Sequence, residues 1–381
     1  MARAAIDGGR PSRRREREGP ARTTLPGGDR RGRDAARRHR SRRLPRRLGA
    51  VRVDHGRGHS RRGPRPHRRR ARRGVAGRAD RRLPRRARPV NRLAALLGTD
   101  RPVLLDGGMG TLLQDSGLAD GDPGELWNLE NPDAVRAAHA AYAEAGARVL
   151  TTNTFGGTRP RLDMHGLGGR LAEVNRNAAR IARSVADEHG LLVAGDLGPT
   201  GELLAPLGTM TPDDAQALFA EQVEALVEGG IDLVLVETLS DLGEADAAIA
   251  AARAVAPDLP IVVTMSFDTN VRTMMGVRPA DAVAHLSAGG VDAVGANCGR
   301  GPEEMELIAA EMVQARTGDV LLVAQSNAGL PQVVGDHFEY DATPADLAAH
   351  AERLAAIGID LVGGCCGSTP AHIAAVRAAL A

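Results

Sequence analysis

From about residue 90 onward, short apolar runs alternate with longer alanine-rich stretches of helical character. The apolar runs are rich in valine, leucine and isoleucine and are short enough to be buried strands. Eight such runs occur, at residues 103–105, 149–152, 191–194, 233–236, 261–265, 293–296, 321–324 and 361–362. Strands that alternate with helices form parallel sheets, and eight strand–helix units fit a (β/α)8 (TIM) barrel over residues 90–381.

The starts of several helices are marked by a capping residue or glycine followed by proline, which suits the first turn of a helix. These pairs are Asn131-Pro132, Thr211-Pro212, Gly301-Pro302, Thr343-Pro344 and Thr369-Pro370. An open doubly wound sheet is the alternative architecture. It usually needs fewer strands, and the first strand here is not followed by a Gly-x-Gly-x-x-Gly turn.

Four of the units align with one another, as "GARVLTTN" from Gly146, "GIDLVLVE" from Gly230, "GVDAVGANC" from Gly290 and "GIDLVGGCC" from Gly358. In each unit a glycine ends a helix, an apolar strand follows, and a polar or thiol residue comes seven places after the glycine. Those residues are Asn153, Glu237, Asn297 and Cys365, and Cys298 and Cys366 come one place later. Equal offsets place all six at the carboxyl ends of strands, where barrel enzymes build their active sites.

The chain has only three cysteines, and all three fall at these matched offsets. Cys298, Cys365 and Cys366 are therefore predicted to converge and to bind Zn²⁺ through three thiolates, with a fourth position open. Adjacent strand residues face opposite ways, so we expect Gly363, Gly364 and Gly367 to let the backbone turn. Burial as small core residues is the alternative interpretation. A zinc ion with an open position suits the binding and deprotonation of one more thiol.

Acidic residues are predicted at the same ends of the strands. Asp106 follows the first strand, Asp196 follows the third and Glu237 ends the fourth. Because a metal would handle thiol deprotonation, Asp106 and Glu237 are better explained as partners of an amino-acid ammonium group than as general bases. Asp196, in "GDLGPTGE", is equally well explained as a turn residue.

At these residues the sequence resembles the homocysteine S-methyltransferase family, in the segments "LLDGGMGTLLQ", "TNTFGG", "VETLSDLGEA", "GANCGRGPEEM" and "GGCCGSTPAHI". The resemblance covers about residues 95–381. It implies a zinc barrel with Cys298, Cys365 and Cys366 as ligands, and transfer of a methyl group to homocysteine to form methionine. It also implies that Asp106 and Glu237 hold the homocysteine amino group and that backbone at Gly107 and Gly108 holds its carboxylate. Asn153, in "TNTFGG", is a further candidate substrate contact.

The methyl donor is left open by the sequence. The segment "QSNAGLPQVVGD" resembles the homocysteine module of cobalamin-dependent methionine synthase, which implies methylcobalamin delivered by a separate protein. A small donor such as S-methylmethionine or a betaine-like compound is the other possibility. Such cations often bind in aromatic cages, and Trp127, Phe155 and Phe267 are the candidate aromatic residues, although each is explained equally well by core packing.

Composition separates residues 1–89 from the rest of the chain. They hold 33 of the 50 basic residues, all of them arginine, and seven of the 47 acidic ones. They lack apolar periodicity, so we expect an arginine-rich disordered segment, or a start assigned too early with translation beginning at Val90. Nucleic-acid binding by this segment is a weaker hypothesis because it contains no aromatic residues for stacking. No membrane span or secretory signal is expected, and the few, odd-numbered cysteines favour a reducing, cytoplasmic location.

Overall fold

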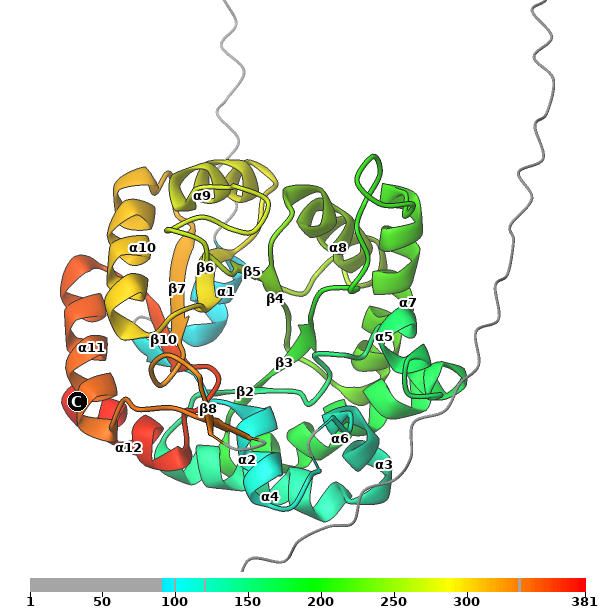
Figure 1. Cartoon of the computed structure of the whole chain (residues 1–381), viewed down its shortest axis with the longest axis horizontal. Helices are drawn as coiled ribbons and strands as arrows, with labels where there is room; N and C mark the ends of the chain where they lie inside the picture. The colour runs from blue at the N-terminus through cyan, green and yellow to red at the C-terminus, as the bar shows by residue number, and fades with distance from the viewer. Residues whose placement is uncertain (1–90, 99–100, 120, 335–336) are drawn as a thin grey trace, which may run out of the picture. The chain divides into compact units, whose positions relative to one another are not determined.

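The computed structural model describes residues 91–98, 101–119, 121–334 and 337–381. The interpretation of residues 1–89 lies outside this part of the chain. Within the described residues, eight parallel strands form a barrel with helices around it (Figure 1), as the sequence predicts. The barrel strands are β1 (Val103–Leu104), β2 (Val149–Thr151), β3 (Leu192–Leu197), β4 (Leu233–Leu239), β5 (Ile261–Met265), β6 (Ala293–Cys298), β7 (Leu321–Ser326) and β10 (Leu361–Gly364).

The strand order is β1-β10-β7-β6-β5-β4-β3-β2, and all neighbouring pairs in it are parallel. A parallel bridge between Leu105 and Val149 brings β1 beside β2 and completes the circle. In this circle β6 lies four places from β2 in either direction. The chain segments that follow β2 and β6 therefore reach the mouth of the barrel from opposite sides.

The helices occur where the proline pairs predict them, with Pro132, Pro212, Pro302, Pro344 and Pro370 each in the first turn of a helix. At Thr211 and Thr343 the threonine hydroxyl also accepts a hydrogen bond from the backbone N–H three residues on. The helices are α1 (Arg92–Leu97), α2 (Met109–Asp115), α3 (Trp127–Glu130), α4 (Pro132–Ala145), α5 (Arg159–Asp163), α6 (Leu171–His189), α7 (Pro212–Gly229), α8 (Leu242–Val255), α9 (Pro279–Ala288), α10 (Pro302–Ala315), α11 (Pro344–Ile357) and α12 (Pro370–Ala379).

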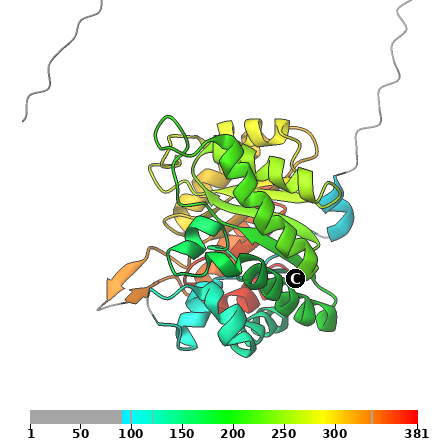
Figure 2. The same ribbon diagram turned by 90° about the vertical axis from the view of Figure 1, so that its right-hand side faces the viewer.

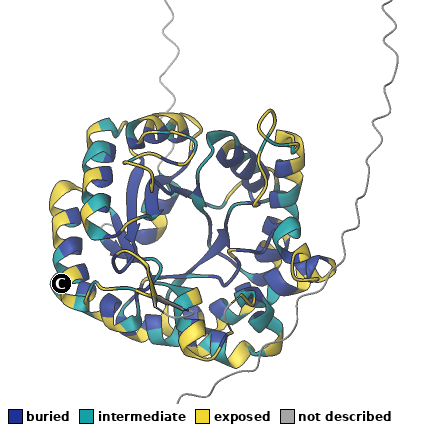
Figure 3. Ribbon diagram, in the orientation of Figure 1, coloured by how far each residue is buried: buried dark blue, intermediate teal, exposed yellow. Residues whose placement is uncertain are grey.

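Two large apolar clusters form most of the core of the described residues, beside two smaller ones. The larger lies between the strands and the surrounding helices, whose inner faces are buried (Figure 3). Many of its helical members are alanines, as in α8, where the small side chains allow close packing on the sheet. The second cluster fills the barrel interior with strand residues such as Leu105 and Leu235, together with Leu93 and Leu97 from α1. No helix in the described part of the chain is both long and apolar enough to cross a membrane.

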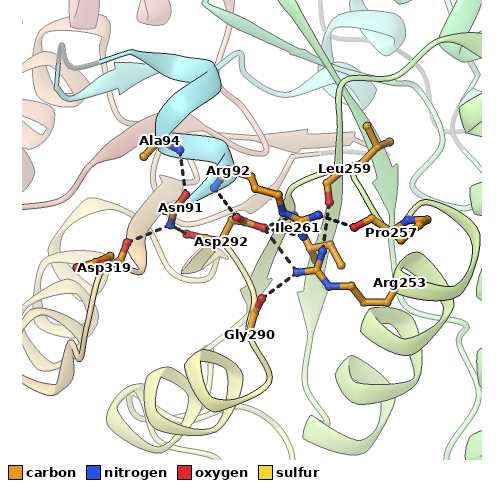
Figure 4. Close-up of polar contacts among 10 residues, drawn as sticks. All are labelled: Asn91, Arg92, Ala94, Arg253, Pro257, Leu259, Ile261, Gly290, Asp292 and Asp319. Carbon is orange, nitrogen blue, oxygen red and sulfur yellow. Dashed lines mark hydrogen bonds and ion pairs between the residues drawn. The ribbon is translucent and has the colours of Figure 1, made fainter. Parts of the chain in front are cut away.

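Helix α1 covers the amino-terminal end of the barrel, and polar contacts fix it there (Figure 4). The Asn91 side chain caps the helix by accepting a hydrogen bond from the backbone N–H of Ala94. Its amide donates to the backbone oxygens of Asp292 and Asp319, at 2.7 and 3.0 Å. The Asp292 carboxylate accepts from the backbone N–H of Arg92 at 3.0 Å. The short helix is therefore held by its cap as well as by its two buried leucines.

Aspartates two places after the repeated glycine recur just before three of the strands. Asp232, Asp292 and Asp360 each accept a hydrogen bond from a backbone N–H at the start of the neighbouring strand, at 2.8 to 3.0 Å. Each also forms an ion pair with an arginine. The repeated unit thus carries a polar contact at the amino end of the barrel as well as reactive residues at the other end.

Two further strands, β8 (Gln332–Val334) and β9 (His337–Glu339), form an antiparallel pair that the strand pattern did not predict. They project from the end of the barrel opposite α1 (Figure 2). Val333 is largely exposed there. An exposed strand that does not face the core lacks the buried apolar positions on which the prediction depended.

Candidate functional site

A cavity of about 440 Å³ opens at the carboxyl ends of the strands. Residues at or just beyond the carboxyl ends of β1, β2, β4, β6, β7 and β10 line it, together with Asp196. Asp196 lies within β3 and not after it as predicted, because that strand continues to Leu197. Every site residue predicted from the sequence lines this cavity. These residues are Asp106, Gly107, Gly108, Asn153, Glu237, Cys298, Cys365 and Cys366.

The three cysteines lie together, with their sulfur atoms within 4.8 Å of one another. The Cys298 Sγ is 2.9 Å from the Cys365 Sγ and 4.0 Å from the Cys366 Sγ. All three are free thiols of intermediate burial. Within the described residues, this is the group of cysteine, histidine and acidic side chains whose geometry suits a metal ion.

The backbone around the cysteines explains how all three sulfur atoms face one point. Cys298 is the last residue of β6 and has φ = 61°, an unusual value for a residue with a side chain. Cys365 and Cys366 come directly after β10, and Gly367 turns the chain away with φ = 78°. The Cys365 N–H donates to the Ser326 carbonyl, and the Ala328 N–H donates to the Cys366 carbonyl. These bonds to the segment at the end of β7 hold the two adjacent cysteines in a conformation that differs from a regular strand, in which successive side chains would point to opposite faces.

The thiols strongly affect one another's protonation. Hydrogen bonds from the Cys298 and Cys365 thiols lower the pKa of Cys366 to about 3. Hydrogen bonding to Cys298 and Cys366, together with burial, raises the pKa of Cys365. The three sulfur atoms therefore cannot all carry charge unless a cation joins them, and a soft divalent metal would serve as that cation.

Asp106 is a buried carboxylate at the end of β1. Its two oxygens accept hydrogen bonds from the Thr151 N–H at 2.6 Å and from the Thr151 hydroxyl at 2.8 Å. Burial raises the pKa of Asp106 to about 6, although the bonds from Thr151 oppose this rise. A positively charged partner would stabilise the ionised form of a buried carboxylate whose pKa is raised in this way.

Glu237 lies on β4 and faces the thiols. Burial and the charge on Cys366 raise the pKa of Glu237 to about 8. The Asn297 amide nitrogen lies 3.5 Å from a Glu237 oxygen and 3.8 Å from the Cys365 sulfur. The same nitrogen donates to the Thr238 hydroxyl at 2.6 Å. Asn297, which the repeat places beside Cys298, therefore connects the carboxylate with the thiols.

Asp196 contributes a further carboxylate to the cavity. Its side chain is 2% exposed, and its Oδ1 atom has no hydrogen-bond partner. Burial, followed by the charges of Glu237 and Glu125, raises the pKa of Asp196 well above its usual value. Glu125 also lines the cavity and accepts a hydrogen bond from the Gly156 N–H at 2.5 Å. The cavity thus contains more buried acid than a single ammonium group would neutralise.

Gly107 and Gly108 bring the start of α2 against the cysteine loop. A Cβ atom on Gly108 would lie 2.7 Å from the Cys365 carbonyl oxygen, which explains why glycine is needed there. The Gly108 N–H donates to the Ser368 hydroxyl at 3.1 Å, and the Tyr142 hydroxyl donates to the Ser368 carbonyl at 3.0 Å. Tyr142 and Ser368 are support residues that the offset argument did not identify, although Ser368 falls inside the cysteine motif.

Asn153 lines the cavity, but its amide is engaged with the protein. Its nitrogen donates to the Gly124 carbonyl at 2.7 Å and to the Asn128 side chain at 3.0 Å. Its backbone oxygen accepts from the Asn128 amide at 2.8 Å. These bonds fix the loop after β2 against the segment at 124–128, and a contact from Asn153 to a substrate stays a prediction.

Of the three candidate aromatic residues, Phe155 lines the cavity and has 36% of its surface exposed. Phe267 is buried in the core, and Trp127 packs against a small apolar cluster with Leu113 and Val135. Within the described residues the cavity therefore has one of the proposed aromatic side chains in its lining. This arrangement does not form an aromatic cage.

Comparison with known proteins agrees with the geometry. The family described as "Homocysteine S-methyltransferase" matches residues 103–380. The methionine synthase of Mycobacterium leprae (strain TN) is 34% identical over 297 residues, which are 74% of this chain and 24% of that protein. The methionine synthase of Mycobacterium tuberculosis (strain ATCC 25618 / H37Rv) is 34% identical over 299 residues, which are 74% of this chain and 25% of that protein. The chain thus spans about a quarter of the length of these relatives.

Solved structures of similar fold include two forms of one enzyme. The homocysteine methyltransferase MmuM from Escherichia coli, in its metallated form, matches with a TM-score of 0.64 and 29% identity. That match covers 75% of this chain and 99% of the MmuM chain. The oxidized form of MmuM matches with a TM-score of 0.63 and 28% identity over 76% of this chain and 99% of that one.

Proposed function

Because the chain belongs to the homocysteine S-methyltransferase family, we propose that its three thiols bind zinc and that the cavity beside them converts homocysteine to methionine. The observation that carries the proposal is the meeting of Cys298 with Cys365 and Cys366 at the cavity that also contains Asp106 and Glu237. Every residue in this argument lies within residues 90–381. We therefore propose that this range is the methyltransferase domain.

The cysteine geometry fits a zinc ion. Zn–S bonds of about 2.3 Å in a tetrahedral arrangement hold sulfur atoms about 3.8 Å apart. The Cys298–Cys366 separation of 4.0 Å is close to that value, and the Cys298–Cys365 separation of 2.9 Å is shorter, so these two sulfur atoms would have to move apart to bind zinc. When bound, zinc supplies a Lewis acid that lowers the pKa of a substrate thiol while leaving its sulfur nucleophilic. Three reduced thiols also suit the reducing, cytoplasmic location proposed from the cysteine content.

The carboxylates are suited to hold the amino group of homocysteine. Asp106 comes from β1 and Glu237 from β4, so together they reach the cavity from two sides. Burial raises the pKa of both carboxyl groups, and for Glu237 the negative charge of Cys366 adds to the effect. An ammonium group between them would stabilise their ionised forms and orient the substrate thiol toward the cysteines.

The methyl transfer requires few proton movements from the protein. The homocysteine thiol gives up its proton to solvent water, and a lone pair of the resulting thiolate forms the new carbon–sulfur bond. The bond between the methyl group and the donor breaks, and its electron pair stays on the donor atom. The residues described here therefore act by binding and orienting homocysteine. The histidine in the cavity lining, His165, follows α5 and does not lie at the end of a barrel strand.

A second candidate function follows from the similarity to methionine synthases, of which this chain spans about a quarter. In that case the domain would activate homocysteine and receive the methyl group from methylcobalamin on a separate corrinoid protein. Formation of methionine from homocysteine and a small donor, without added protein, would contradict this alternative.

Removal of one thiol tests the metal site. We expect Cys298→Ala to retain less than about a tenth of the zinc of the parent protein and to lose methionine formation, because two thiolates bind zinc much more weakly than three. Zinc content is measured by elemental analysis, and folding by circular dichroism. Asp196→Asn is the matched control, since it alters the same cavity without removing a thiol, and it should keep its zinc. A full zinc content in Cys298→Ala would remove the ligand assignment.

A further inference from the structure

Arg161 lies at the mouth of the cavity and has no partner in the described part of the chain. It belongs to the short helix α5, which follows β2, and it is the arginine in the cavity lining. The neighbouring Arg159 differs, because it forms an ion pair with Glu221 and donates a hydrogen bond to the Gly168 carbonyl. Among the residues that the structure describes, Arg161 has no hydrogen-bond or ion-pair partner, and its side chain runs beside Gly201.

The position of Arg161 separates it from the thiols. Cys298 ends β6, and β6 lies four places from β2 in the circle of strands. The arginine therefore approaches the cavity from the side opposite to Cys298. An anion held by Arg161 would belong to a molecule that reaches across the mouth toward the reacting sulfur, and not to the part of homocysteine that lies against the cysteines.

Asp196 provides a carboxylate on the same side of the cavity as the Arg161 guanidinium. Asp196 comes from β3, the strand next to β2, and its buried Oδ1 atom has no partner. Asp106 and Glu237 already provide for the ammonium group of homocysteine. A second cationic group would pair with Asp196, as a carboxylate would pair with Arg161.

We propose that the outer part of the cavity recognises a methyl donor that carries a carboxylate, and that Arg161 binds this carboxylate. Asp196 is the partner of a cationic nitrogen in the same donor, and the exposed face of Phe155 lies in the same lining. This inference rests on the proposed function, because it assumes that homocysteine occupies the inner part of the cavity. It favours a small sulfonium amino acid over a methyl group presented by a separate protein.

The test compares two sulfonium donors that differ in one group. S-methylmethionine carries a carboxylate, and (3-aminopropyl)dimethylsulfonium is the same molecule without it. With full-length zinc-containing protein and saturating homocysteine, we expect Arg161→Met to raise the KM for S-methylmethionine by about tenfold to a hundredfold, the usual effect of losing a hydrogen bond between charged groups. The KM for homocysteine should change by less than about threefold. With the carboxylate-free donor, the variant and the parent should be alike.

Arg159→Met is the matched control, since it removes an arginine from the same helix that does not line the cavity. It should leave both donor KM values unchanged. A rise in the homocysteine KM of Arg161→Met, with the donor KM unchanged, would overturn the inference by assigning the arginine to homocysteine. Turnover with methylcobalamin and not with either sulfonium would overturn it while leaving the proposed function intact. Absence of methionine with every donor would instead count against the proposed function.

Discussion

Asn297 shows how one side chain can serve several neighbours at the site. Its amide oxygen accepts from the Thr238 N–H at 2.9 Å and from the Thr264 hydroxyl at 2.8 Å. Thr238 has φ = 61°, so the bond from its N–H supports an unusual backbone conformation directly after Glu237. The amide nitrogen faces Glu237 and Cys365. Asn297 is therefore a positioning residue for two groups that we propose bind the substrate and the metal.

Replacement of this amide by a carboxylate should harm substrate binding. Asn297→Asp keeps the acceptor for Thr238 and Thr264 but turns the N–H groups that face Glu237 and Cys365 into a negative oxygen. We expect kcat/KM for homocysteine to fall by about tenfold to a hundredfold, since a hydrogen bond to a charged group contributes about 1.5–3 kcal/mol. Steady-state kinetics with homocysteine varied give the value.

Asn175→Asp is the control for this variant. Asn175 is also fully buried, and its amide donates to the carbonyls of Gly157 and Leu171, away from the thiols. It should lower stability without a comparable loss of kcat/KM in the protein that remains folded. Equal kinetic losses in the two variants would show that Asn297 acts only through folding.

At the scale of single elements, α1 combines a cap, a backbone contact and two buried leucines in six residues. A helix this short is not stable by itself in water. Its stability comes from the barrel interior, because Leu93 is fully buried and Leu97 nearly so. The helix in turn covers apolar strand residues at the amino-terminal end of the barrel that would otherwise face water.

Two leucines of this helix provide a direct comparison. We expect Leu93→Ala to lower the free energy of unfolding by about 2–5 kcal/mol, the usual cost of truncating a buried leucine. Leu96, which is 43% exposed, provides the matched control, and Leu96→Ala should change stability by less than about 1 kcal/mol. Urea unfolding followed by circular dichroism measures both. Similar values for the two variants would mean that α1 does not contribute to the folded core.

Among the elements, the sequence predicted those that face the core and missed those that do not. The eight barrel strands have the apolar runs that burial requires, and prolines mark several helix starts, so both were predictable. The β8–β9 pair projects from the barrel, and its exposed Val333 follows no burial pattern.

Cys298, Cys365 and Cys366 were predictable as a group because equal offsets from a repeated glycine define equal heights in a barrel. Arg161 lies in the five-residue helix α5 after β2, whose position depends on tertiary contacts, so no periodic signal identified it.

At the scale of the whole molecule, stability and chemistry occupy opposite ends of the barrel. The aspartate contacts and α1 lie at the amino-terminal end, and the cysteines and carboxylates lie at the other. His139 is a buried ionisable group outside both regions. It lies in α4 with no exposed surface, and neither ring nitrogen has a hydrogen-bond partner.

His139 makes the stability of the protein depend on pH. Burial lowers the pKa of His139 from 6.5 to about 4. The unfolded chain therefore binds a proton at this position between those values while the folded chain does not, so stability falls as the pH drops through this range. We expect the parent protein to lose about 2–3 kcal/mol more than His139→Leu between pH 7 and pH 4.5. Urea unfolding at the two pH values measures the difference, and parallel losses in both proteins would contradict it.

Backbone pairing between neighbouring strands of the barrel is shortest between β1 and β2. Between β1 and β2 the ladder consists of the Leu105–Val149 bridge, and the Asp106 carboxylate adds its two bonds to Thr151 directly beyond it. The Asp106 side chain thus adds hydrogen bonds between β1 and β2, where the backbone pairing of the barrel is shortest. Asp106, which we propose binds the substrate amino group, therefore also helps to close the barrel. A mutation made there to alter recognition would weaken the contact between β1 and β2 as well.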